Sequence, residues 1–301
     1  MSELPLSATN DAALQAAPAT KARGYWATVG RRIRRDKVSM ACALVLLLIF
    51  LSAMLAPWLG LEDPYKGSMI RRLRHIGTSG YPLGTDELGR DMLARLIYGG
   101  RLSLVIGILP VILAFGIGTS LGLVAGYVGG KLNTAIMRTI DVFYAFPSVL
   151  LAIAISGALG AGILNSIVSL TVVFVPQITR VAESVTTGVR NMDFVEAARA
   201  SGAGPFTIMR VHILGNVLGS IFVYATSLIS VSMILAAGLS FLGLGTQPPQ
   251  SSWGLMIQAS RDYLDVAPWT GLVPGAAVAL TVLGLNMSGD ILRDVFDPRT
   301  N

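Results

Sequence analysis

The sequence predicts an all-α integral membrane protein with six transmembrane helices. Of 301 residues, 53% are hydrophobic and only 13% are charged, and the mean hydropathy is +0.65. Soluble domains carry about 25% charged residues, so the chain lies far outside that class. Six apolar runs also approach or exceed the roughly 20 residues that cross a bilayer. We expect spans over residues 38–58, 102–127, 140–158, 163–181, 218–244 and 269–287.

Cysteine and histidine are too scarce for several kinds of site. Cys42 is the single cysteine and lies in an apolar run, which excludes an internal disulfide and a cysteine-based metal cluster. The histidines are His75 and His212, so we expect no metal site and no cofactor. The net charge of +6 comes from basic residues beside apolar segments, as in membrane proteins. We therefore expect contact with membrane lipid and none with nucleic acid.

Charge distribution predicts the orientation in the membrane. Residues 1–37 are expected to form a cytoplasmic N-terminal tail, and residues 38–300 the transmembrane domain. The tail ends in a basic cluster, which favours the cytoplasmic side, and the first span is too long for a cleavable signal peptide. Six crossings then return the C-terminus to the cytoplasm. Segment 61–101 is expected outside, although it is rich in arginine.

The segment between the first two spans contains an amphipathic pattern. Leu88, Met92 and Leu96 recur at helical spacing, opposite Arg90 and Arg95. This pattern predicts a helix that lies on the membrane surface with its arginines toward water.

Glycine recurs every fourth residue in the second span, at Gly118, Gly122, Gly126 and Gly130. The spacing gives one helix face without side chains, where another helix can approach closely. The end of this strip does not complete a phosphate-binding loop, because Leu132 stands where that motif requires Ser or Thr. No ATP site is visible in the chain.

Prolines and ionisable residues in the spans bear on the source of energy. Pro147 and Pro176 are expected to kink spans three and four. Asp141, Arg180 and Asp290 are expected near helix ends, so that the middle of each span lacks a charge. Ion-driven transporters place ionisable groups within the bilayer. We therefore expect energy to come from a separate protein.

Mildly polar side chains on spans four and five are the candidates for a solute path. They are Asn165, Ser166, Gln177, Tyr224, Ser227 and Ser230. Serine in a membrane helix more often bonds a backbone carbonyl or a neighbouring helix, and that alternative stays open for each of them. The absence of strong charge favours a permissive path, with selection done elsewhere.

The loop at residues 190–213 is the longest charged interruption in the apolar second half. Asp193 and Glu196 have the spacing of a capping box, Gly202 suits a helix stop, and Pro205 suits the first turn of a second helix. The pattern predicts two short helices joined by a turn, on the cytoplasmic side after four crossings.

Glu196-Ala197-Ala198 with Gly202 and Ile213-Leu214 resembles the EAA loop of ABC importer permeases. The family usually has Leu-Pro where this chain has Leu214-Gly215. The resemblance implies a type I ABC importer permease architecture and a loop that docks on an ATPase. The docking residues it implies are Glu196, Ala197, Ala198, Arg199, Gly202 and Pro205. A role for Glu196 as a capping residue alone remains open.

Three further segments, 81–104, 239–249 and 289–299, resemble the "C" type permease of the dipeptide, oligopeptide and nickel branch. Some relatives carry a glutamate where this chain has Ala236, so no role of that acid transfers. The resemblance implies a transport subunit of the bacterial inner membrane that is not an enzyme, with ATP hydrolysis on a partner. Implied partners are a second homologous permease, two ABC ATPases and an extracytoplasmic substrate-binding protein.

The alternative function is a stand-alone channel or secondary transporter in which the 190–213 loop is only a connector. Uptake without an ATPase would distinguish it from the importer. If the chain is an importer subunit, the sequence does not decide which solute it carries. The candidates are dipeptide, oligopeptide, nickel, glutathione, opine and sugar.

Overall fold

The computed structural model describes residues 37–296, which apart from Lys37 belong to one compact unit, Val38–Asn301. The predicted tail before residue 37 and the family-like C-terminal residues 297–299 lie outside the described part. So does the side chain of Asp290.

The all-α membrane fold predicted from the sequence is confirmed. Among the described residues, five helices are long and apolar enough to cross a membrane, and a bent pair adds a sixth crossing if counted as one. The five are built on α2 (Lys37–Leu55), α3 (Met92–Val128), α6 (Ile163–Val189), α9 (Leu214–Phe241) and α11 (Trp269–Phe296). The bent pair consists of α4 (Gly130–Tyr144) and α5 (Ser148–Leu159).

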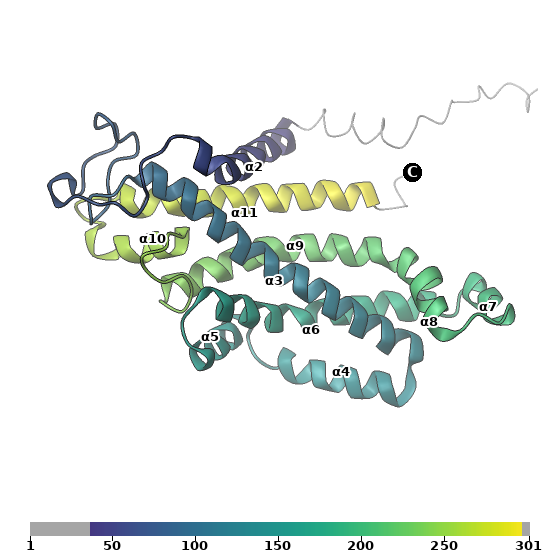
Figure 1. The fold of residues 1–301 in the computed structure, drawn as a ribbon. Helices are drawn as coiled ribbons and strands as arrows, with labels where there is room; N and C mark the ends of the chain where they lie inside the picture. The colour runs from purple at the N-terminus through teal and green to yellow at the C-terminus, as the bar shows by residue number, and fades with distance from the viewer. Residues whose placement is uncertain (1–36, 297–301) are drawn as a thin grey trace, which may run out of the picture. The chain divides into compact units, whose positions relative to one another are not determined.

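Shorter helices lie at the two ends of the bundle. They are α7 (Asp193–Ala200), α8 (Pro205–Thr207), the π-helix η3 (Ile208–Ile213) and α10 (Trp253–Ser260). Single 3₁₀ turns are η1 (Ala56–Trp58), η2 (Met69–Arg71) and η4 (Arg261–Tyr263). Figure 1 shows α7 and α8 at one end, and α10 with the α2–α3 connection at the opposite end.

The tightest helix contact is that of α3 with α6, along the predicted glycine strip. A Cβ added at Gly122 would lie 2.5 Å from the Ala182 Cβ, and similar clashes arise at Gly118 and Gly126. The strip is therefore confirmed at these three positions. Gly130 departs from it, because a Cβ there would meet nothing within 4 Å. Gly130 instead begins α4 with a φ of +56°, where the chain reverses after α3.

The third predicted span is not one helix. We expected a single helix over 140–158, but α4 ends at Tyr144 and α5 begins at Ser148, at an angle of 88°. Pro147 accounts for the break, because proline has no N–H to donate and disfavours helical dihedrals in the residue before it. Pro176, in contrast, lies inside the continuous helix α6.

The fourth span is longer than expected, and this changes the position of two charges. We expected its end at residue 181, but α6 continues to Val189. Arg180 therefore lies about 13 Å inside the helix, at a rise of about 1.5 Å per residue. Asp141 pairs with Arg180 from the end of α4, beside the break in the third span. Asp141 thus lies near a helix end as expected, whereas the expectation is wrong for Arg180, which lies inside α6.

No surface helix precedes α3. Asp91 caps α3 by accepting hydrogen bonds from the backbone N–H groups of Leu93 (3.0 Å) and Ala94 (3.2 Å), and the helix then runs unbroken into the second span. Arg90 and Arg95 do not face water: they are 8% and 3% exposed. The expectation of an amphipathic helix lying on the membrane is therefore wrong.

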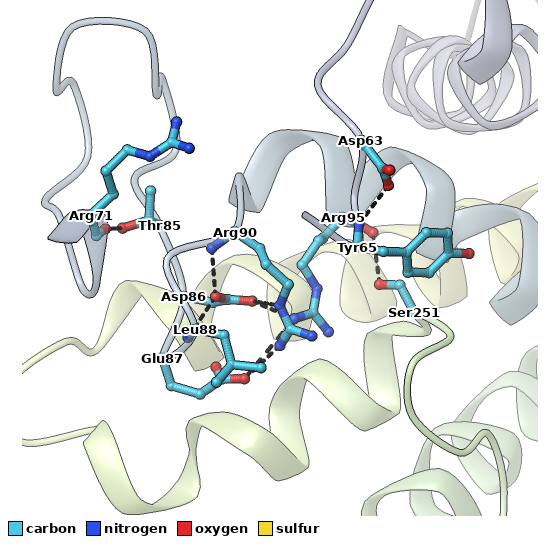
Figure 2. Close-up of polar contacts among 10 residues, drawn as sticks. All are labelled: Asp63, Tyr65, Arg71, Thr85, Asp86, Glu87, Leu88, Arg90, Arg95 and Ser251. Atoms are coloured by element: carbon cyan, nitrogen blue, oxygen red, sulfur yellow. Dashed lines mark hydrogen bonds and ion pairs between the residues drawn. The ribbon is translucent and has the colours of Figure 1, made fainter. Parts of the chain in front are cut away.

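Both arginines enter a buried ion cluster, defined here as Asp86, Glu87, Arg90 and Arg95 (Figure 2). Asp86 accepts hydrogen bonds from Arg90 Nε at 2.6 Å and from Arg95 Nη1, and Arg90 Nη2 donates to Glu87 at 2.6 Å. Two carboxylates thus balance two guanidinium groups. The cluster joins the extramembrane connection to the start of α3.

For the pKa of Glu87, the effect of burial is larger than that of the pairing with Arg90. Desolvation raises the pKa of Glu87 above its ordinary value, and the negative charge of Asp86 adds to the rise. The hydrogen bond from Arg90 lowers the pKa by less. Asp86 is therefore the better partner for the two arginines, since its carboxylate also accepts backbone bonds from Leu88 and Arg90 at 2.9 Å.

Candidate functional site

Helix α7 presents one apolar and one polar face. Val195 and Ala198 are buried, at 0% and 8% exposure, and pack on the main core. Glu196, Ala197 and Arg199 are exposed on the other side. The helix is thus anchored by its apolar face, which includes Ala198 of the expected docking residues, while Glu196 and Ala197 are free for a partner.

The predicted capping box is absent. The N-cap residue of α7 is Met192, whose carbonyl accepts from the N–H groups of Val195 (2.8 Å) and Glu196 (3.2 Å). Asp193 is the first helical residue and makes no capping bond, because the helix begins one position earlier than we expected. Both acids still lie in the first turn, where the helix dipole favours them. Helix capping therefore does not explain why a glutamate stands at position 196 (Glu196).

The predicted helix stop at Gly202 is confirmed. Its φ is +81°, a conformation that costs other L-residues roughly 1 kcal/mol or more. The N–H of Gly202 donates to the Arg199 carbonyl (3.0 Å), and that of Ala203 donates to the Ala198 carbonyl (3.1 Å). These two bonds form a Schellman motif, which fixes the turn after α7.

The second short helix of the loop continues directly into the fifth span. Pro205 occupies the first turn of α8, as predicted. The helix then passes through η3 into α9, so that residues Pro205–Phe241 form one crossing in place of the expected 218–244. Gly215 lies inside α9. A π-helical segment of this kind often occurs at functional sites.

Arginines tie the loop to the helix bundle. The guanidinium of Arg199 donates to the Arg190 carbonyl (3.3 Å) and lies 5.4 Å from the ring centroid of Tyr127 at the end of α3. Arg190 in turn donates to the Gly126 carbonyl (3.1 Å). A force applied to α7 therefore acts directly on the ends of α3 and α6.

Exposed apolar side chains lie along the loop that contains α7 and α8, and the sequence analysis missed them. Phe206 is 70% exposed, Val211 62%, Met192 49% and Phe194 37%. Exposed apolar groups with polar neighbours are typical of protein contacts. Aromatic residues in an otherwise polar loop were the signal that could have identified them.

Most of the six candidate path residues make local contacts inside the bundle. Ser166 and Ser230 are buried, at 0% and 2% exposure, and the Ser166 hydroxyl donates to the Gly162 carbonyl (3.0 Å). Asn165 donates to the carbonyls of Leu159 and Gly160, both at 2.9 Å, and so closes the turn between α5 and α6.

The remaining three candidates are Tyr224 and Ser227 on α9 and Gln177 on α6. Ser227 donates to the Val223 carbonyl (3.3 Å) on α9, and Tyr224 packs half-buried against the main core. Gln177 lines a hollow of about 80 Å³ together with Tyr144 and Ser148. The structure does not bring the six residues together; Gln177 is the one that lines this hollow beside the break between α4 and α5.

A bundle of apolar helices with a structured helical loop at one end defines a multi-span membrane protein. Two family models match the chain. Residues 118–301 match the binding-protein-dependent transport system inner membrane component. Residues 24–74 match the N-terminal transmembrane domain of oligopeptide transport permease C.

Similar proteins extend over nearly the whole chain. A glutathione transport system permease of Pectobacterium atrosepticum is 40% identical over 92% of both chains. A di/tripeptide transport system permease of Pseudomonas aeruginosa is 39% identical over 88% of this chain and 89% of its own. A chain of the inward-facing MetNI methionine ABC transporter shares the fold, with a TM-score of 0.58 at 21% identity, over 68% of this chain and 97% of its own.

The chain belongs to the family of binding-protein-dependent transport system inner membrane components. It is a multi-pass inner-membrane permease subunit of an ABC importer, not an enzyme, and ATP hydrolysis takes place on a separate subunit. The family works with ATPase and binding-protein partners. These findings favour the importer over the stand-alone channel or secondary transporter.

Proposed function

We propose that this chain moves peptides or peptide-like solutes, glutathione included, and that α7 is the coupling helix that docks on the ATPase. The names of the relatives support the solute class. The observation that carries the docking role is the free polar face of α7, with Glu196 exposed and without a capping role.

The proposed mechanism is mechanical. ATP-driven closure of the ATPases displaces α7, and the Schellman turn at Gly202 keeps it rigid relative to α8. Through Arg199 and Arg190, the displacement reaches the ends of α3 and α6. The bundle then alternates between inward-open and outward-open states without covalent chemistry on this chain.

The docking role fixes the proposed orientation. The end with α7 faces the cytoplasm, and the end with α10 and the α2–α3 connection faces outward (Figure 1). Both termini are then cytoplasmic. The outer end receives the binding protein, and the full importer contains a second homologous permease and two ABC ATPases.

Substitution at the docking face tests the proposal. We expect Glu196→Lys, and Gly202→Pro, to abolish the stimulation of ATP hydrolysis by loaded binding protein, and uptake with it. The first reverses a charge at the contact, and proline cannot adopt the φ of +81° at Gly202. The measurement is hydrolysis and peptide uptake by the complete transporter in liposomes.

Thr134→Lys is the control, because it adds a cation to the exposed surface of α4 without touching α7. Uptake at the wild-type rate by both α7 variants would rule out the docking role. Loss of uptake in the control as well would show that added charge alone is harmful.

A further inference from the structure

An ion pair lies exposed on the bundle between α4 and α6. Arg180 Nη2 contacts Asp141 Oδ1, and the two side chains are 50% and 40% exposed. The Arg180 guanidinium also lies 4.8 Å from the ring centroid of Tyr144. All three groups are therefore accessible from outside the chain.

Such a pair is incompatible with a surface that faces lipid. A charged side chain within the hydrocarbon core of a bilayer is costly, so intramembrane charges face the bundle interior or a water-filled cavity. The lipid-compatible surface of this chain is different: α2 exposes Leu44, Leu47, Leu48 and Leu51 and carries no charge beyond its first residue. The face with Asp141 and Arg180 must meet water or another protein.

The helix break indicates water. Non-helical backbone at membrane depth is tolerated where it is buried in protein or lines an aqueous cavity. The break between α4 and α5 borders the hollow of about 80 Å³, whose lining includes Tyr144, Ser148 and Gln177. Within the described part of the chain, the Gln177 amide forms no hydrogen bond, so its donors and acceptor are free.

We propose that Asp141, Arg180, Tyr144 and Gln177 form a charged station in the solute path that receives a zwitterionic solute. The Arg180 guanidinium takes the solute carboxylate, Asp141 takes the ammonium group, and Gln177 bonds a backbone amide between them. The station rests on the proposed function, because peptides with free termini carry these three groups.

The pairing of the two residues gives selectivity for a solute with both charges. Before the solute arrives, Asp141 pairs with Arg180 and, at 4.0 Å, with Arg138 of its own helix. A zwitterion can replace both partners at once, whereas a solute with one charge leaves one of the two residues without its partner. The buried ion cluster around Asp86 cannot act in this way, because Asp86, Arg90 and Arg95 are closed off from solvent.

The test uses the complete transporter in liposomes with saturating binding protein and radiolabelled dialanine. Arg180→Gln, Asp141→Asn and the double variant are compared with wild type and with Lys131→Gln, which removes an exposed cation from the same helix α4. We expect uptake to fall by about tenfold or more in each single variant, since each loses a charge-assisted hydrogen bond to the solute. The control keeps the wild-type rate.

The double variant separates solute binding from a structural role. Neutralising both members of a structural ion pair is often nearly neutral, so a purely structural pair predicts recovery of uptake. The station predicts that the double variant stays at least about tenfold impaired, with an unchanged unfolding midpoint. Recovery of uptake in the double variant would overturn the station alone. A wild type that hydrolyses ATP with its binding protein but takes up neither dialanine nor glutathione would overturn the proposed solute class, and the station with it.

Discussion

Gly122→Leu is expected to prevent assembly of the folded bundle. The added side chain would start 2.5 Å from the Ala182 Cβ, 2.6 Å from the Thr179 carbonyl oxygen and 2.7 Å from the Glu183 nitrogen. Two of these are backbone atoms of α6, so only a separation of α3 from α6 could relieve the clash. Size-exclusion chromatography in mild detergent should show aggregate in place of the wild-type peak.

Substitution of Gly122 by alanine allows the cost of the clash to be measured as a change in stability. Gly122→Ala should destabilise the protein by about 1–3 kcal/mol, the usual cost of overpacking. Gly116→Ala is the matched control, because it lies on the same helix and its added Cβ would meet nothing within 4 Å. Alanine there should stabilise the helix by about 0.5–1 kcal/mol. Equal effects at the two sites would contradict the close approach of α3 and α6.

Asp86→Asn is expected to produce the second large loss of stability. The substitution keeps the shape but removes the charge shared by Arg90 and Arg95, which are 8% and 3% exposed. Breaking a buried pair costs about 3–5 kcal/mol, because a charge is left without its partner. A dye that reacts with the single cysteine, Cys42, can report the unfolding midpoint, which should fall by roughly 10 °C.

Glu62→Gln is the control for this prediction. Glu62 lies in the same connection and pairs with Arg71 at 3.6 Å, but its side chain is 53% exposed. Exposed pairs contribute about 0–1 kcal/mol, so the midpoint should barely move. A fall of similar size in both variants would mean that burial of the cluster is not what makes it important.

Features set by local spacing were predictable from the sequence. The glycine repeat at 118, 122 and 126 gave the α3–α6 contact, because four-residue spacing places small residues on one helix face. Gly202 gave the turn after α7, because glycine adopts positive φ without strain. Both predictions depend on a few neighbouring residues and not on the rest of the fold.

Features set by distant partners were not predictable. The sequence pattern predicted Arg95 at the surface. Its burial depends on the folded α2–α3 connection, in which Asp86 is its partner. The same holds for Arg180, whose partner Asp141 lies 39 residues away on another helix. Periodicity describes one helix at a time and cannot show which charges a second element will cover.

The break in the third span was only partly predictable from the sequence. Pro147 signalled a disturbance, but a kink and a complete break give the same sequence pattern. The structure shows the break, and with it the hollow beside Gln177. Of the six candidate path residues, Gln177 lines this hollow, and Arg180 was wrongly expected at a helix end.

The most direct test of the account is a pull-down of the tagged chain, expressed with its partners and purified in mild detergent. Wild type, Glu196→Lys and Thr134→Lys are compared, and the co-purifying chains are identified by mass. The account predicts that a second permease and an ATPase accompany the wild type and the Thr134 variant, and that Glu196→Lys keeps the permease but loses the ATPase. Equal recovery of the ATPase with Glu196→Lys would contradict docking through α7.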